Sequence, residues 1–220
     1  MAVRVNHFAI SLDGYGAGEG QCLEAPFGHA GTRLMEWFFD TRMGRQVHGE
    51  TGGVRGVDDA FTSQWGAGVG VEIMGMNKFV PPEKRDDSQW RGWWGEEPPF
   101  RTPVLVLTHT PREPIEFANG TSFRFVDASP VEALELARRI AAEDPGGRTD
   151  IRIGGGATTL RDFLAADLVD HLHLVVVPII LGRGVRLWDG LEGVEDGFHV
   201  ESVSSPSGVV HVTLTRDPRD

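Results

Sequence analysis

Short apolar runs alternate along the chain with polar, glycine-bearing stretches, a pattern that predicts an α/β protein. Val3–Ser11 is rich in β-branched and aromatic residues and predicts a buried first strand. Val104–Thr108 is continuously apolar, as in strands that helices cover on both faces. Further strands are expected at Gly70–Gly75, Ser122–Val126, Asp150–Ile153, His171–Val177, Phe198–Ser204 and Val209–Thr215.

Helical periodicity is clearest in Pro130–Glu143, where Ser129 is the expected cap. Two shorter helices are predicted at Gly31–Thr41, capped by Thr32, and at Asp58–Gly66, capped by Asp58. The inward positions of the long helix are expected to be Val131, Leu134, Leu136 or Ala137, and Ile140. Loops are predicted at the glycine-rich Arg42–Val57 and at residues 81–103, a length that favours a functional loop or an interface.

Strands and helices alternate up to residue 183 and a hairpin ends the pattern. This order predicts a three-layer α/β fold with helices on both faces of a mostly parallel sheet and an antiparallel C-terminal hairpin. No repeat or linker composition interrupts the chain, so residues 1–220 are expected to form a single domain.

A formal charge of −11 argues against a nucleic-acid or anionic-membrane partner, because no basic stripe is present. The chain has one cysteine, Cys22, which excludes an internal disulfide and is typical of a reducing compartment. Neither a secretory signal nor an apolar run of about 18 residues is found, so we expect a cytoplasmic protein.

The most informative stretch is Asp150–Gly184, in which a strand delivers Gly154, Gly155 and Gly156 to a helix of about Thr158–Ala166. Unpaired N–H groups, the helix dipole and the missing side chains favour anion binding at such a point. The alternative is a tight turn that only packs the helix onto the strand. A phosphate-bearing ligand is the first hypothesis.

A Rossmann fingerprint is not the source of these glycines. The sequence Gly154-x-Gly156-x-x-Thr159 lacks the last glycine and lies late in the chain. The following strand ends at Val177-Pro178, without a carboxylate for the ribose.

Five motifs instead resemble, in order, the dihydrofolate reductase-like family that includes the C-terminal reductase domain of the bifunctional deaminase–reductase of riboflavin biosynthesis. Together they span residues 5 to 188, nearly the whole chain. The motifs are Ser11-Leu12-Asp13-Gly14-Tyr15, Ile73-Met74-Gly75-Met76-Asn77, Val106-Leu107-Thr108-His109, Ile153–Leu160 and Val177–Gly184.

The resemblance implies a bound NADPH. Its pyrophosphate would be held by Gly154, Gly155, Gly156, Ala157, Thr158 and Thr159. Its adenosine ribose and 2′-phosphate would be held by Gly75, Met76, Asn77, Lys78, Thr108 and His109, and its nicotinamide would lie near Ala9, Ile10 and the Leu12–Gly14 loop.

The second motif departs from the family. Relatives usually have an arginine for the 2′-phosphate where this chain has Met76, and Lys78 and His109 are left to supply the charge. NADH therefore stays open beside NADPH, because a 2′-phosphate without a fixed fork donor is bound less specifically.

The implied reaction is hydride transfer to a C=N or C=O carbon of a small pterin- or pyrimidine-type substrate, with a proton added to the neighbouring atom. The candidate acids are Asp13 and Asp40, although Asp13 could simply hold a turn and Asp40, with Glu36, could simply face solvent. Leu12, Trp37, Leu181 and Gly182 are the expected substrate-binding residues. A non-catalytic nucleotide-binding protein on the same fold is the alternative.

One histidine pair and one group of tryptophans carry weaker hypotheses. His171 and His173 share a strand, but no third ligand has metal-site spacing, so we expect hydrogen-bonded strand histidines and no metal. Trp90, Trp93 and Trp94 could line a substrate pocket or cover a dimer surface. A homodimer is the expected assembly.

Overall fold

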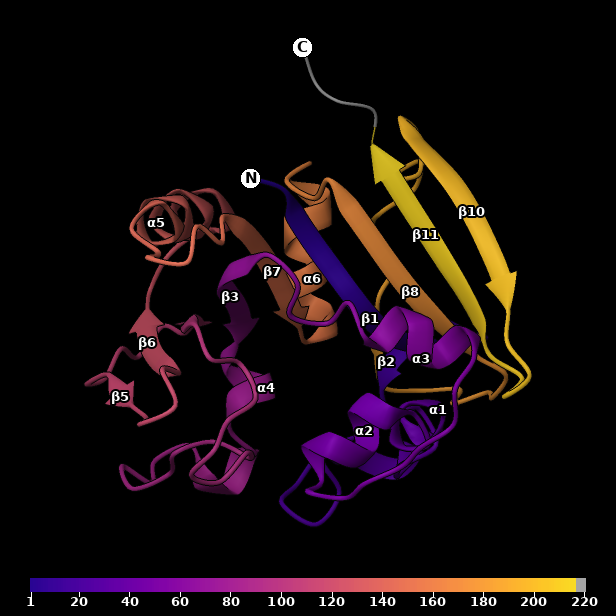
Figure 1. Cartoon of the computed structure of the whole chain (residues 1–220), viewed down its shortest axis with the longest axis horizontal. Helices are drawn as coiled ribbons and strands as arrows, with labels where there is room; N and C mark the ends of the chain where they lie inside the picture. Colours follow the sequence, from indigo (N-terminus) through magenta and orange to yellow (C-terminus); the bar gives the residue numbers. More distant parts are fainter. Residues whose placement is uncertain (217–220) are drawn as a thin grey trace. The chain divides into compact units, whose positions relative to one another are not determined.

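The computed structural model describes residues 1–216, which cluster into two compact units. Unit 1 consists of Met1–Arg4 and Gly68–Asp170, and unit 2 consists of Val5–Ala67 and the described residues from His171 onward. In the described part of the chain, nine strands form a sheet of order β10-β11-β8-β1-β7-β3-β4-β6-β5 (Figure 1). Strand β1 (Val3–Ser11) contributes to both units. The predicted mostly parallel sheet with an antiparallel C-terminal hairpin is confirmed.

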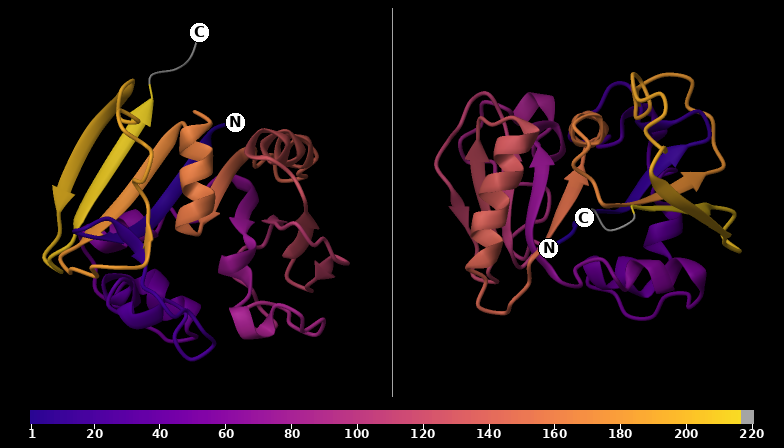
Figure 2. Two further views of the ribbon diagram at one scale, coloured as in Figure 1. Left: turned by 180° about the vertical axis from the view of Figure 1, so that it is seen from behind. Right: turned by 90° about the horizontal axis from the view of Figure 1, so that it is seen from above.

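Unit 1 contains the parallel strands. Val3 and Arg4 of β1 pair with β7, β7 with β3, β3 with β4 and β4 with β6, all in parallel, and β5 adds an antiparallel edge. Helix α5 packs on β3, β4 and β7, and α6 packs on β3 and β7 (Figure 2). The bounds are β3 Val69–Gly75, α4 Met76–Phe79, η2 Pro82–Lys84, β4 Pro103–Leu107, β5 Ile115–Glu116, β6 Ser122–Val126, α5 Pro130–Ala142, β7 Asp150–Gly155 and α6 Ala157–Ala165.

Unit 2 contains the C-terminal hairpin of β10 and β11, which is antiparallel and continues to β8 through β11. A separate two-stranded sheet joins β2 to β9. The bounds are β2 Tyr15–Ala17, η1 Gly28–Ala30, α1 Glu36–Phe39, α2 Arg42–Val47, α3 Val57–Thr62, β8 His171–Val177, β9 Val185–Arg186, β10 Phe198–Ser204 and β11 Val210–Arg216.

The long helix α5 begins as predicted. Ser129 and Glu132 form a reciprocal capping box that satisfies backbone N–H groups of the first turn. Leu134 and Ala137 are buried, whereas Val131 is exposed, so its predicted inward orientation was wrong. The buried stripe of the helix begins at Ala133 and continues through Leu134, Ala137 and Ala141.

The region of residues 31–62 differs most from the prediction. The first helix is only Glu36–Phe39, because Gly31 has a positive φ of 58° and turns precede Met35. The predicted loop after it contains α2, capped by Thr41, whose hydroxyl accepts from the Gly44 N–H at 3.0 Å. A glycine is needed at position 44 because a Cβ would lie only 2.1 Å from the Phe38 carbonyl oxygen. Helix α3 is capped by Gly56, and its predicted cap Asp58 instead bonds a histidine.

Candidate functional site

Strand register in unit 1 gathers three of the predicted cofactor motifs at one edge of the sheet. Gly75 of β3 pairs with Leu107 of β4, and Met74 pairs with Gly155 of β7. The Met76–Lys78 turn, Thr108 and Gly156 therefore follow the carboxyl ends of adjacent parallel strands, about 5 Å apart. This is the edge where open α/β sheets bind ligands.

The glycine loop enters α6 through Gly156, the N-cap residue, and no side chain caps the helix. The first turn carries no acidic side chain, so its N–H groups and the positive end of the helix dipole are presented to an anion. A Cβ on Gly156 would have no heavy atom within 4 Å. Space for a phosphate oxygen therefore adjoins these donors. The Gly155–Gly156 peptide bond is cis.

The other three glycines at this edge are explained by contacts and backbone conformation within the protein. A Cβ on Gly154 would lie 2.0 Å from Glu72 Oε1, and one on Gly75 would lie 2.3 Å from Thr159 Oγ1. Gly155 has a positive φ of 101°, which disfavours any side chain. The tight-turn interpretation thus accounts for Gly154, and the anion interpretation suits Gly156.

Next to Gly154 lies a charged cluster in which Glu72 and Arg152 are buried and Lys78 is half-buried. Arg152 donates from Nε to Glu72 Oε2 at 2.8 Å and also donates from Nη2 to that oxygen. Lys78 Nζ donates to the Gly154 carbonyl at 2.7 Å and to Glu72 Oε1 at 3.3 Å. Sequence reasoning missed Glu72 and Arg152. The available signal was a charged residue between two β-branched apolar neighbours in each strand.

The far end of this edge is polar and open. His109 Nδ1 lies 3.0 Å from Asp127 Oδ1, with the His109 side chain 99% exposed. Asn77 accepts a hydrogen bond from the Arg85 guanidinium, and Thr108 lies beside Thr110. Met76 is half-buried. These residues offer donors and acceptors for a sugar.

Asp13, a predicted proton donor in unit 2, holds two loops together. Its Oδ1 accepts from Ser11 Oγ at 2.6 Å and from the Leu181 N–H at 3.1 Å, and its Oδ2 accepts from the Gly182 N–H at 2.6 Å. Burial raises the pKa of Asp13, but these hydrogen bonds outweigh it and lower the pKa from 3.8 to about 2. A carboxylate ionised at neutral pH suits loop positioning better than proton donation.

Replacing Asp13 by alanine is expected to release the Leu181–Gly182 backbone. Both N–H groups lose their carboxylate acceptor, so their amide hydrogens should exchange faster while those of the β8 ladder keep their protection. Hydrogen exchange measured by NMR tests this, with Asp40→Ala as the control that leaves Leu181 and Gly182 unchanged. Equal protection of the two amides in both variants would contradict the loop role.

The remaining predicted residues of unit 2 divide by exposure. Ala9, Trp37 and Leu181 belong to a buried apolar cluster, and the Trp37 indole N–H donates to the Leu34 carbonyl at 3.1 Å. Ile10 is buried as well. Leu12 is 60% exposed, and the Asp40 side chain is 71% exposed beside Arg45. Gly14 (φ 86°) is buried and Gly182 (φ 74°) is exposed, and both glycines shape the loops.

A chain of buried histidines, also in unit 2, was predicted only in part. The His7 N–H donates to His173 Nδ1 at 3.3 Å, His173 Nε2 lies 3.0 Å from His211 Nδ1, and His211 Nε2 lies 2.7 Å from Asp58 Oδ1. The backbone donor at one end and the carboxylate at the other make both rings Nε2–H tautomers. Phe61 stacks on both rings at 4.4 and 4.3 Å.

Thus His173 is hydrogen-bonded within the strand layer, as expected, and His171 bonds Thr215 Oγ1. The available signal for the partner of His173 was His211, a histidine within the predicted strand Val209–Thr215. Two tryptophans hold the long loop of residues 81–103 against the rest of unit 1. Trp94 stacks on Phe123, and the Trp90 indole N–H donates to the Phe79 carbonyl.

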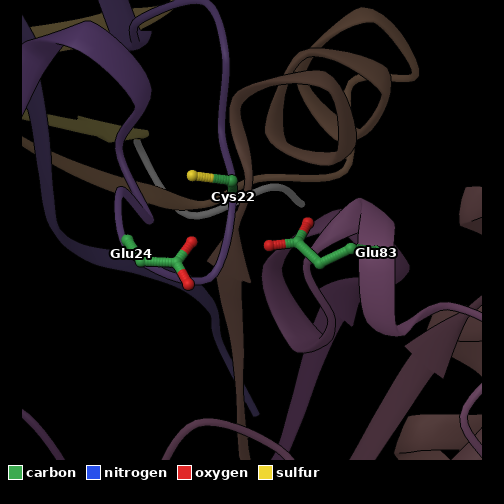
Figure 3. A group of neighbouring side chains, drawn as sticks. All are labelled: Cys22, Glu24 and Glu83. Atoms are coloured by element: carbon green, nitrogen blue, oxygen red, sulfur yellow. The ribbon is translucent and has the colours of Figure 1, made fainter.

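Figure 3 shows Cys22, Glu24 and Glu83, whose ligand atoms could suit a metal ion. Cys22 and Glu24 belong to unit 2 and Glu83 belongs to unit 1, and both glutamates are exposed. We assign no metal site to them. Within residues 1–216, no helix combines the length and apolar character that a membrane crossing requires.

Comparison with known protein families agrees with the family resemblance of the five motifs. The model of the RibD C-terminal domain family matches residues 3–210. The chain belongs to this family. The predicted resemblance to the reductase domain of riboflavin biosynthesis is therefore confirmed, and the RibD C-terminal domain accounts for nearly the whole chain.

Solved structures show the same RibD-type fold. A candidate riboflavin biosynthesis protein from Shewanella sp. PV-4 has a TM-score of 0.60 at 23% identity, over 99% of this chain and 100% of that one. The diaminohydroxyphosphoribosylaminopyrimidine deaminase/5-amino-6-(5-phosphoribosylamino)uracil reductase of Thermotoga maritima has a TM-score of 0.52 at 15% identity, over 98% of this chain and 56% of that one. Acinetobacter baumannii RibD has a TM-score of 0.50 at 16% identity, over 99% of this chain and 58% of that one. Among curated proteins none matches the chain.

Proposed function

We propose that the protein is an NAD(P)H-dependent reductase of a small pterin- or pyrimidine-type heterocycle. The observation that carries the proposal is the open space at Gly156, next to the uncapped first turn of α6, in a member of a reductase domain family. A pyrophosphate would fit there: donors converge, side chains are absent and no carboxylate opposes it.

The chain's own residues would bind and orient. The N–H groups of Ala157–Thr159 would hold the pyrophosphate, and Thr108 and His109 would hydrogen-bond the adenosine ribose. When bound, the nicotinamide would supply a hydride for a C=N or C=O carbon, and solvent water would supply the proton for the neighbouring nitrogen or oxygen. By accepting hydrogen bonds from the Leu181 and Gly182 N–H groups, the Asp13 carboxylate would set the shape of the Leu12–Gly14 and Leu181–Gly182 loops, where the substrate is expected.

The substrate class follows from the relatives. The Thermotoga maritima enzyme is named a 5-amino-6-(5-phosphoribosylamino)uracil reductase, and that aminopyrimidine is our first candidate substrate. Arg183 and Arg186 could meet its phosphate: both are on the surface, Arg183 beside Glu19 and Arg186 bonding the Asp13 carbonyl. Oxidation of NADPH by this compound or by dihydrofolate, followed by absorbance, tests the reaction. Binding without oxidation would favour the alternative, a non-catalytic nucleotide-binding protein.

Gly156→Asp tests the pyrophosphate position. Aspartate is a good N-cap residue and its Cβ meets open space, so the protein should fold with a melting temperature within a few degrees of the parent. Its carboxylate would occupy the phosphate site with a like charge, and affinity for NADPH and NADH should fall about 100-fold or more, equivalent to about 3 kcal/mol. Fluorescence titration measures this, with the isosteric Gly156→Asn as the uncharged control. Unchanged affinity in the aspartate variant would contradict the placement.

A further inference from the structure

Lys78 is half-buried, and its ammonium is hydrogen-bonded within the protein. It lies in α4, directly after β3, and its ammonium spans the gap to β7, where it donates to the Gly154 carbonyl at 2.7 Å. That carbonyl precedes the two glycines that lead into α6. The side chain of Lys78 therefore fixes the orientation of the peptide on which the loop turns.

The carboxylate below keeps Lys78 in this place. Glu72 is fully buried and offers one oxygen to each cation, Oε1 to Lys78 and Oε2 to Arg152. Burial is the main cause that lowers the pKa of Lys78, Arg152 adds to the effect, and Glu72 opposes it. Releasing Lys78 toward solvent would leave Glu72 with one cation and the Gly154 carbonyl without this donor.

We propose that Lys78 is a positioning residue that orders the glycine loop for the pyrophosphate, and that it makes no contact with a 2′-phosphate. The proposal rests on the proposed function, because the loop is taken as the cofactor's phosphate site. It predicts that losing Lys78 weakens NADH and NADPH alike, since both carry the same pyrophosphate. A 2′-phosphate contact would instead weaken NADPH alone.

The test compares Lys78→Met with Lys78→Arg and with Lys84→Met. Lys84, the last residue of η2, pairs with Asp87 and serves as the matched control. Lys78→Met is expected to raise the Kd of both cofactors by about tenfold, as for the loss of one charge-assisted hydrogen bond. Lys78→Arg should recover part of the affinity, and Lys84→Met should match the parent. A loss confined to NADPH, or no loss at all, would overturn the proposal.

A second measurement needs no cofactor. Amide exchange of Gly155 and Gly156 should be faster in Lys78→Met than in the parent and unchanged in Lys84→Met. Unchanged exchange at these amides in Lys78→Met would overturn the positioning role. If the parent bound neither cofactor while exchange still rose in Lys78→Met, the proposed function would fail and the loop-ordering role of Lys78 would stand.

Discussion

Glu72→Ala is expected to lower the free energy of unfolding by about 3–5 kcal/mol, the cost of breaking a buried ion pair from one side. Glu72 is fully buried and Arg152 is 3% exposed, so the substitution leaves a guanidinium in the core facing a cavity. The Lys78 ammonium loses its carboxylate at the same time. Urea unfolding of the parent and variant measures the difference.

Two companion variants separate the charge from the volume. Glu72→Gln keeps the shape and one acceptor oxygen and should be destabilised less than Glu72→Ala. The double variant Glu72→Leu with Arg152→Met removes both charges of the pair and should recover much of the loss, as apolar replacements of buried ion pairs do. A Glu72→Ala protein as stable as the parent would show that the cluster contributes little to folding.

Acid is expected to destabilise the protein through His173, beginning well above the range where carboxylates titrate. Burial lowers the pKa of His173 from 6.5 to about 2, with further contributions from His7, His211 and His171. Below pH 6.5 the His173 imidazole is therefore protonated in the unfolded chain, whereas in the folded chain it stays neutral down to about pH 2. Stability is fully present above pH 6.5 and falls as the pH drops through this window.

The expected loss between pH 7 and pH 5 is about 2 kcal/mol, from a slope that approaches about 1.4 kcal/mol per pH unit. Chemical denaturation at a series of pH values measures it. His173→Phe keeps a ring against Phe61 and removes the titrating group, so the variant should show a flatter profile even if its stability is lower throughout. His171→Phe, on the same strand, is the control that should retain the slope. Equal slopes in His173→Phe and the parent would rule out His173 as the source.

Local signals predicted the regular elements well. Ser129, Pro130 and Glu132 are a capping box in the sequence itself, and α5 begins where they place it. β6, β8 and β10 have their predicted bounds, because apolar alternation and flanking polar residues define strands directly. The order of five short motifs was enough to indicate the family.

Long-range partnerships were not accessible in the same way. Glu72 and Arg152 are 80 positions apart, and only the β3–β7 register brings their side chains together. His173 and His211 likewise meet through the β8–β11 pairing. Gly44 was taken as a sign of a loop because sequence alone does not distinguish a flexible glycine from one that another backbone touches. In the Gly154–Gly156 stretch, Gly154 is explained by its contact with Glu72 and Gly155 by its positive φ, and neither cause can be read from the sequence.

These contacts refine the candidate site. Gly154 and Gly75 pack the loop against Glu72 and Thr159, and Lys78 fixes the Gly154 carbonyl, which leaves Gly156 as the position that faces free space. A loop held this firmly from below loses little entropy when a phosphate binds, and preorganisation of this kind favours affinity.

Calorimetric titration of the parent protein with NADPH and with NADH is the most direct test of the central claim, that the β7–α6 loop binds a nicotinamide dinucleotide. We predict saturable one-to-one binding of at least one of them, which Gly156→Asp weakens about 100-fold. No saturable binding of either cofactor to the folded parent, or binding that Gly156→Asp leaves intact, would contradict the account.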